Sequence, residues 1–391
     1  MLRLSKPAGV ARSQRPTRGY QTNAPTTGED KRITALKIRI RQAAYTGSSS
    51  QLLAVRNSDL FQECYEWGKR QAISTSTSNM DSQQPGARNA AAVHTICYAL
   101  DAYVNFSTRY AATPLNAAAA GSNQDKTKLD QVFLQQIRKP HKEDLLAKFH
   151  ATFQANDEQR QRALMSSLDP ILAEKLITEG IVRHATAHAA HTASAQPPAP
   201  ASRLNEAELL ALLDYLSSSS GTFNMVNGAA MAKAYYGEPA LQACVSVYST
   251  MLNNAINKLC SHPWFGRRDI EVYKGIRLTT LDEPFRTAML REAHQTHGSI
   301  SFPSVLSASC DPNSSYARTK FTEGYTLECV MTMRRGFYAD PFHDTQSMGE
   351  HEILGPAMQR FRVEGKSSVM VNDPNTGSEY EIDRYQLQPH D

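Results

Sequence analysis

The spacing of apolar residues along the chain predicts helices first and strands later. In the first half, apolar positions recur with a helical period in these segments: 57–73, 87–106, 126–139, 141–154 and 168–182. Asp169 before Pro170 is a typical helix start, whereas residues 29–45 fit neither a helix nor a strand cleanly. We therefore expect a mainly helical region up to residue 183.

The pattern changes after residue 203. Helical periods continue in 204–216, 239–259 and 282–298. Asp282 is placed to cap the last of these helices and Gly298 to end it. Beyond Ile270, apolar and polar residues alternate as in strands, in these segments: 271–278, 301–310, 325–333, 367–371 and 379–387. Helices followed by antiparallel strands predict an α+β domain.

Residues 184–202 are rich in alanine, proline and small polar residues, a composition typical of a linker. His184, His188 and His191 would share one face of a helix there. No cysteine or carboxylate accompanies them, so we expect no metal site.

The first 28 residues contain no acidic side chain and these basic ones: Arg3, Lys6, Arg12, Arg15 and Arg18. Such a segment buries too little apolar surface to order itself, so we expect a disordered leader. Its composition also fits a mitochondrial transit peptide. The expected organisation is a leader (1–28), a mainly helical region (29–183), a linker (184–202) and an α+β domain (203–391).

Composition and charge exclude several classes of function. The 391 residues carry a net charge of +4, without a basic stripe interleaved with aromatics, so we expect no nucleic-acid partner. No run of about 18 apolar residues predicts a transmembrane helix, and no apolar region follows the N-terminus as in a Sec signal peptide. The six cysteines are widely spaced, which favours a reduced protein in a cytosol.

Two of the predicted strands carry polar residues that a plain core does not need. In the first, Lys274 precedes Gly275, and a glycine within a strand often marks the close approach of a ligand. An ordinary edge strand with solvated cations is the alternative. In the second, Ser307 and Ser309 share a face. No neighbouring base activates a serine there, so we expect these hydroxyls to orient another group.

A third strand carries two acids. If residues 348–356 form a strand, Glu350 and Glu352 share one face and His351 lies on the other. Two carboxylates at such a short distance repel each other, unless a cation lies between them or one of them is protonated. An exposed acid pair without a role is the alternative.

In this order, the three strands resemble the arginine–serine–glutamate class of mono-ADP-ribosyltransferases. The family's aromatic-Arg-Gly, Ser-Thr-Ser and Glu-x-Glu motifs are similar to Tyr273-Lys274-Gly275, Ser307-Ala308-Ser309 and Glu350-His351-Glu352. The stretches FPSVLSAS, YARTKF and EHEILGP also resemble the family's sequence, and LDYLSSSSGTFNMVNGAAM resembles its helical lobe. The resemblance covers residues 203–391 and implies an ADP-ribosyltransferase-like domain with a helical lobe and two packed antiparallel sheets.

The resemblance implies NAD as co-substrate, no metal, and transfer of ADP-ribose to an arginine of a host protein. The expected catalytic residues are Glu352, which would stabilise positive charge on the ribose, Ser307, which would orient Glu352, and Glu350, which would face the acceptor arginine. The expected NAD-binding residues are Lys274, Gly275, Arg277, Ser309 and Phe321. The loop 339–349 would contact the protein substrate through Phe342 and His343. His351 would have no chemical part.

The sequence departs from the family at Lys274, where the family has an arginine with its planar, bidentate head group. Arg277 would lie on the opposite strand face unless a bulge at Gly275 turns it round. Three functions stay open: an active arginine-directed transferase, a binding protein that keeps the fold without productive NAD binding, and an NAD glycohydrolase. The retained Glu350, Glu352 and Ser307 favour the first.

The regions before the predicted transferase domain resemble those of type III effectors of plant-pathogenic bacteria. This resemblance implies secretion by a non-Sec route into a host cell and action in the host cytosol. The leader would then be a translocation signal, and a secretion chaperone becomes an expected partner.

Overall fold

The computed structural model describes residues 28–46, 49–77, 85–111, 126–182, 202–217, 219–277, 283–319, 325–344, 349–373 and 376–390. The predicted leader up to residue 27, the three spaced histidines, Asp282 and Phe321 lie outside these residues. Within the described part of the chain, no helix is long and apolar enough to cross a bilayer, and the six cysteines form no disulfide there.

Helices make up the first part of the chain: α1 (Gly28–Tyr45), α2 (Ser49–Arg56), α3 (Asp59–Thr77), α4 (Pro85–Arg109), α6 (Lys126–Gln136), α7 (Lys139–Ala155), α8 (Glu158–Ser166) and α9 (Pro170–Thr178). The segment 29–45 is therefore helical, because Ile33, Leu36 and Ile40 bury one stripe of α1. Asp169 caps α9 as predicted, since its side chain accepts a hydrogen bond from the Leu172 N–H.

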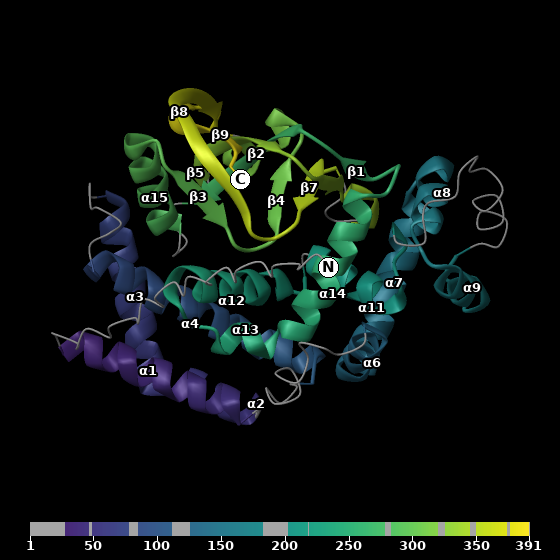
Figure 1. The fold of residues 1–391 in the computed structure, drawn as a ribbon, viewed down its shortest axis with the longest axis horizontal. Coiled ribbons are helices and arrows are strands. Elements are labelled where there is room, and N and C mark those ends of the chain that lie inside the picture. The colour runs from purple at the N-terminus through teal and green to yellow at the C-terminus, as the bar shows by residue number, and fades with distance from the viewer. Residues whose placement is uncertain are drawn as a thin grey trace, which may run out of the picture.

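The second helical group lies directly beneath the strands: α11 (Glu206–Leu216), α12 (Thr222–Tyr236), α13 (Ala240–Cys244) and α14 (Ser246–Cys260) (Figure 1). Asn205 and Glu208 form a capping box that starts α11. The single helix expected over 239–259 is two, because Val245 leaves the helical conformation (φ −113°, ψ 14°).

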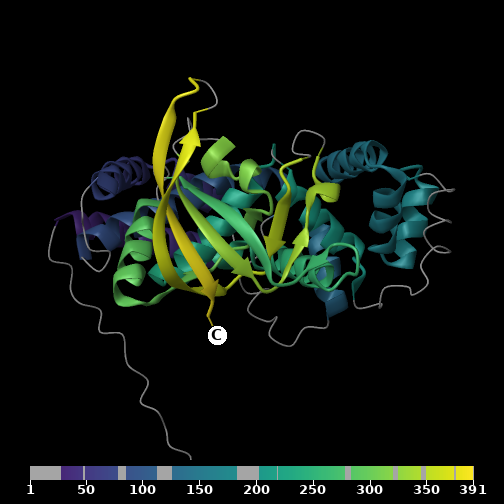
Figure 2. The same cartoon turned by 90° about the horizontal axis from the view of Figure 1, so that it is seen from above.

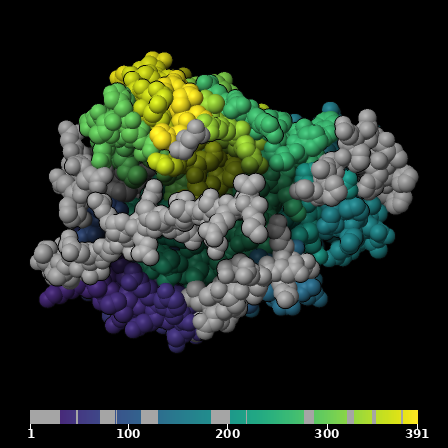
Figure 3. All heavy atoms as spheres, in the orientation of Figure 1, coloured from purple at the N-terminus to yellow at the C-terminus, as the bar shows by residue number. Residues whose placement is uncertain are grey.

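Helices on both sides of residues 184–202 share one hydrophobic core. Phe149 and Phe153 of α7 belong to the same cluster of buried residues as Leu209 of α11 and Leu252 of α14. Figure 3 shows the strands together on one side of the molecule and α1 on the opposite side. The division of the chain into four parts stays a prediction.

The strands are β1 (Gly266–Arg267), β2 (Ile270–Arg277), β3 (Ser299–Phe302), β4 (Leu306–Ser309), β5 (Tyr325–Met333), β6 (Gly336–Tyr338), β7 (Glu352–Gly355), β8 (Gln359–Asn372) and β9 (Glu379–Pro389). The helices α15 (Glu283–Thr296) and α16 (Tyr316–Thr319) interrupt them. Together with the helices before them, these strands confirm the α+β class. The segment 301–310 holds parts of two strands, β3 and β4, rather than one.

Among the described residues, the strands join in the order β1-β6-β7-β4-β2-β5-β9-β8-β3. Where β4 meets β2, the register contains a single pair, Tyr273 opposite Ser309. We call β1, β6, β7 and β4 half-sheet A, and β2, β5, β9, β8 and β3 half-sheet B. The two packed antiparallel sheets expected from the resemblance are here two halves of one sheet, joined at one pair. Half-sheet B also contains a parallel pair, β5 with β9.

Half-sheet A packs into two hydrophobic cores, one of which it shares with half-sheet B. In half-sheet A, Phe337 and Leu354 pack into the core that includes helices α4, α7, α11 and α14. In half-sheet B, Val272 and Phe361 belong to a second cluster, which contains Leu290 of α15 and also side chains of β4 and β7 from half-sheet A. The hairpin of β8 and β9 extends beyond the rest of the sheet (Figure 2).

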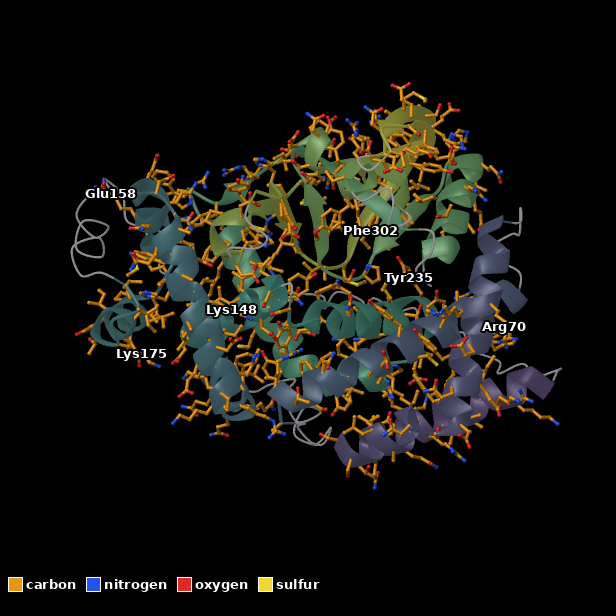
Figure 4. The ribbon with its side chains drawn as sticks, turned by 180° about the vertical axis from the view of Figure 1, so that it is seen from behind. Arg70, Lys148, Glu158, Lys175, Tyr235 and Phe302 are labelled. Atoms are coloured by element: carbon orange, nitrogen blue, oxygen red, sulfur yellow. The ribbon has the colours of Figure 1, made fainter. Side chains whose placement is uncertain are left out.

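Helix α12 meets half-sheet B at its β3 edge. The Tyr235 hydroxyl donates a hydrogen bond to the carbonyl oxygen of Ser301, and Figure 4 shows Tyr235 beside Phe302 at this contact. The helical layer therefore touches both halves of the sheet and fixes the sheet above it.

Candidate active site

Ser307 and Glu352 lie on neighbouring strands of half-sheet A. In the pairing of β4 with β7, Ser309 is opposite Glu352 and Ser307 is opposite Leu354. Directly opposed residues of an antiparallel pair point to the same face, so Ser307 is the diagonal neighbour of Glu352 on that face. The Ser307 hydroxyl donates a hydrogen bond to Oε1 of Glu352. The sequence predicted this contact, and the structure brings the two side chains together.

His343 holds the other oxygen of the same carboxylate. Its Nε2 lies 2.6 Å from Oε2 of Glu352, and the side chains are only 4% and 12% exposed, respectively. The sequence predicted His343 as a contact to the protein substrate. The structure instead places it in the interior beside Glu352, with its backbone at the end of the 3₁₀ turn Asp340–Phe342.

The electrostatics of this pair keep the carboxylate ionised. Burial by itself would raise the pKa of Glu352, but the charge and hydrogen bond of His343, the hydroxyl of Ser307 and the charge of Lys274 bring this pKa below its ordinary value. Burial would also lower the pKa of His343, yet the charge and hydrogen bond of Glu352 raise it above its ordinary value. Each group stabilises the charged form of the other.

Asp340 fixes the backbone that enters β7. Its carboxylate is buried and accepts hydrogen bonds from the backbone N–H groups of Glu352 (2.8 Å) and His351 (3.0 Å). It also accepts one from the Tyr338 hydroxyl (2.9 Å). These three donors hold the buried carboxylate in one place, so Asp340 sets the position from which the Glu352 side chain projects.

Glu350 lies outside the strand that the sequence predicted for it. Strand β7 begins at Glu352, and His351 adopts a left-handed backbone conformation (φ 52°). The strict alternation expected for 348–356 therefore does not hold at its start. The Glu350 carboxylate accepts a hydrogen bond from the Tyr316 hydroxyl (2.9 Å). Burial and the nearby charge of Glu352 raise its pKa above the ordinary value, against the Tyr316 hydrogen bond.

Lys274 reaches across the junction between the half-sheets. Its Nζ donates a hydrogen bond to the backbone carbonyl of Ser307 (3.1 Å), and its charge contributes to the low pKa of Glu352. Gly275 lies opposite Glu328 of β5. The irregularity in this pairing falls between Ile276 and Arg277, not at Gly275 as considered from the sequence. The Arg277 side chain is outside the described part of the chain.

Two predicted site residues have different surroundings from those expected. The Ser309 hydroxyl donates to the backbone carbonyls of Asp311 (3.0 Å) and Glu350 (3.2 Å), so it fixes local backbone. Phe342, expected on the substrate-facing surface, is 1% exposed. Its ring packs edge-on against Phe265 and Phe337 in the core, because the 3₁₀ turn that precedes His343 directs it inward.

Other residues near Glu352 were missed by the sequence interpretation. Tyr316 and Asp340 lie in stretches that the sequence analysis named, YARTKF and the loop 339–349, but neither was assigned a role there, and Ser309 was assigned to NAD binding rather than to the backbone. Tyr215 of α11 is buried, and the charge of Glu352 contributes to its raised pKa after burial itself. Asn227 of α12 donates to the Tyr215 hydroxyl (3.1 Å). Both residues fall in the stretch that resembles the helical lobe of ADP-ribosyltransferases, which was the one available signal.

No protein-family model matches the sequence, and no curated protein matches it. Among solved structures, the ADP-ribosyltransferase HopU1 of Pseudomonas syringae pv. tomato DC3000 aligns with a TM-score of 0.36 and 21% identity, over 47% of this chain and 77% of its own. The ADP-ribosyltransferase Vis aligns with a TM-score of 0.31 and 12% identity, over 48% and 74%. The enzymatic component C2-I of the Clostridium botulinum C2 toxin aligns with 0.32 and 13%, over 48% and 44%.

The solved structures that are similar to this chain thus include ADP-ribosyltransferases. These TM-scores are below 0.5, so the likeness carries no argument about function. The described residues contain no group of three or more histidine, cysteine or acidic side chains arranged to hold a metal ion.

Proposed function

We propose that this protein transfers ADP-ribose from NAD to an arginine side chain of another protein. The observation that carries the proposal is the carboxylate of Glu352. It is nearly buried, held at one oxygen by Ser307 and at the other by His343, and kept ionised. A carboxylate fixed in this way is preorganised to stabilise a positive charge that develops on a substrate.

The chemistry of NAD fits such a group. Its nicotinamide is cationic and a good leaving group, and breaking the bond to ribose builds positive charge on the sugar, as in glycoside hydrolysis. Each oxygen of Glu352 has one protein partner and can accept a further hydrogen bond from a ribose hydroxyl. We assign this role to Glu352 and the orientation of its carboxylate to Ser307 and His343.

Glu350 is suited to the acceptor. Its Oε2 accepts from Tyr316, and no hydrogen bond to Oε1 is found among the described residues, which leaves it able to pair with a guanidinium group. The raised pKa of Glu350 would fall when an acceptor cation neutralises the repulsion from Glu352. A carboxylate in this place therefore favours a positively charged acceptor such as arginine.

Lys274 gives a specific reason to keep a second candidate. Its ammonium group already donates a hydrogen bond to the Ser307 carbonyl inside the protein. In addition, a lysine cannot form the bidentate phosphate contact of an arginine. The second candidate is a protein that keeps this site without productive NAD binding. In the transferase that we propose, Lys274 contacts the NAD phosphates as a single point charge, with Gly275 beside it.

The test uses the full chain, labelled NAD and agmatine, a small guanidine acceptor. We expect label transfer by the wild type and a loss of about 10²–10³-fold with Glu352→Gln. Glu350→Gln should lose transfer to agmatine but still release nicotinamide. Glu364→Gln, a matched change at an exposed acid of β8 paired with Arg362, should behave as wild type.

Three outcomes separate the candidates. Transfer that depends on Glu352 and Glu350 supports the arginine-directed transferase. Nicotinamide release that is the same with and without agmatine shows an NAD glycohydrolase. Absence of NAD binding by calorimetry shows the binding protein without catalysis.

We further propose that the chain acts as a bacterial effector in the cytosol of a host cell, delivered by a non-Sec route. The support is the basic, acid-free composition of residues 1–28 and the resemblance of the whole organisation to type III effectors. A translocation assay would compare a reporter fused to the full chain with one fused to residues 29–391. Equal delivery of both reporters would remove the role of the leader.

A further inference from the structure

Helix α7, which precedes the predicted transferase domain in sequence, reaches the turn that carries His343. The Thr152 hydroxyl donates a hydrogen bond to the backbone carbonyl of His343 (2.8 Å). Four residues later, the Asn156 amide donates to the carbonyl of Pro341 (3.2 Å) and to the carbonyl of Thr152 (2.9 Å). Thr152 is 1% exposed and Asn156 4% exposed, so both contacts lie inside the protein.

The contact of Thr152 is unusual for a helical threonine. A threonine within a helix commonly donates back to the carbonyl four residues earlier. Thr178 of α9 and Thr250 of α14 do so, at 2.9 Å and 2.8 Å. Thr152 instead turns its hydroxyl outward from the helix axis to the His343 carbonyl. The Thr152 hydroxyl thus forgoes a hydrogen bond within α7 and binds the residue that follows the turn Asp340–Phe342.

Helix α7 is itself firmly placed. Phe149 and Phe153, on either side of Thr152, are fully buried in the core shared with the helical layer under the sheet. In Figures 1 and 2, α7 lies beside the end of the sheet that contains β7. A helix packed in the core thus reaches the segment that follows β6, and it fixes the carbonyls of Pro341 and His343 from outside the sheet.

We propose that α7 is a positioning element of the candidate active site. Thr152 and Asn156 hold the turn Asp340–Phe342 and the residue after it, so that His343 meets Oε2 of Glu352 and Asp340 meets the backbone of Glu352. The N-terminal helical region then belongs to the same catalytic unit as the strands. This inference rests on the function proposed above, although the geometry it describes does not depend on NAD.

The first test compares Thr152→Val, which keeps the shape and removes the hydroxyl, with Thr152→Ser, which restores a donor. Thr250→Val is the matched control, because it removes a hydroxyl that bonds only within its own helix. We expect Thr152→Val to lower kcat about tenfold or more with little change in KM for NAD, because the reacting groups are misplaced. Thr152→Ser should recover most of the rate, and the control should match wild type.

The second test does not need catalysis. The imidazole of His343 is titrated by NMR in the wild type and in each variant. The titratable groups that face it are Glu352, Glu350 and Asp340. Glu352→Gln should lower the midpoint of His343, and Thr152→Val should lower it in the same direction, because the histidine is no longer held against the carboxylate. Thr250→Val should leave the midpoint unchanged.

The results separate this inference from the proposed function. If the wild type transfers no label but Thr152→Val shifts the His343 midpoint, the positioning role stands and the transferase assignment fails. If Thr152→Val leaves both kcat and the midpoint at wild-type values, the positioning role is wrong. Should Thr152→Val not fold, Asn156→Ala removes the second contact to the turn and is measured in the same two ways against the same control.

Discussion

Half-sheets A and B meet at one backbone pair but hold their candidate site residues in different ways. Half-sheet A presents Ser307 and Glu352, and its entry turn is fixed by Asp340 and helix α7. Half-sheet B presents Lys274, which donates a hydrogen bond across the junction to the Ser307 carbonyl. The difference indicates that the helical part of the protein holds the backbone near Glu352. The position of the Lys274 ammonium group instead depends on the junction between the two half-sheets.

The largest expected effect compares a buried ring in each half. Phe342 packs under the turn of half-sheet A and Phe361 in the core of half-sheet B, both 1% exposed. Each change to alanine should destabilise the protein by about 3–5 kcal/mol in urea unfolding. Only Phe342→Ala should also lower the activity of the folded fraction, because His343 follows that ring directly. Equal activity in the two variants would show that the turn does not depend on the core beneath it.

Lys274 gives the next largest effect. Lys274→Met should raise KM for NAD about tenfold, or about 1.4 kcal/mol in binding, with a smaller change in kcat. The reason is that Lys274 of half-sheet B would contribute to NAD binding, whereas Glu352 of half-sheet A would contribute to the chemical step. Steady-state kinetics and calorimetry with NAD provide the measurement, and Lys366→Met, at an exposed ion pair with Asp383, is a matched control. A fall in kcat alone would contradict this division.

The charge pair of half-sheet A should make stability depend on pH. The pKa of Glu352 is lowered, so its contribution is present above the unfolded value of about 4.3 and is lost as pH falls through the folded pKa. The pKa of His343 is raised, so its contribution is present below the unfolded value of about 6.5 and is lost as pH rises through the folded pKa.

The two contributions overlap between roughly pH 4.3 and 6.5. The difference in unfolding free energy between wild type and His343→Gln should therefore be largest in that range and shrink on both sides of it. Denaturant unfolding at a series of pH values measures it. A difference that is flat from pH 4 to 8 would mean that the pair carries no net charge interaction.

The smallest expected effect concerns the rim of the site. Tyr316→Phe removes the hydrogen bond to Glu350, which is partly exposed and contributes about 0.5–1 kcal/mol. We expect a change of a few-fold in KM for the guanidine acceptor and none in KM for NAD. Kinetics with varied agmatine at fixed NAD tests this. A change in KM for NAD instead would mean that Tyr316 contributes to NAD binding and not to acceptor binding.

The sequence allowed the α+β class, most helices and the meeting of Ser307 with Glu352 to be predicted, because these depend on periodicity and on local spacing. The position of Glu350 was not predictable in the same way. Alternation assumes a regular strand, and the left-handed backbone of His351, held by Asp340, breaks it.

His343 and Phe342 show a second limit. Both lie in a short polar-flanked loop, for which surface exposure is the usual expectation. Their burial depends on α7 and on the aromatic residues Phe265 and Phe337, which are distant in sequence. A single sequence holds no signal of such long-range packing.

The hydrogen bond between Thr152 and His343 joins residues 191 positions apart. Contacts of such high sequence separation form slowly in folding, because closing the long loop between them costs conformational entropy before the contacts stabilise the chain. During synthesis, α7 emerges long before the strand that carries Glu352. The chain therefore holds the Glu352 carboxylate beside a fixed histidine only after α7 and the strands that follow it have folded together, and a partly unfolded chain has the acid without its partner in place.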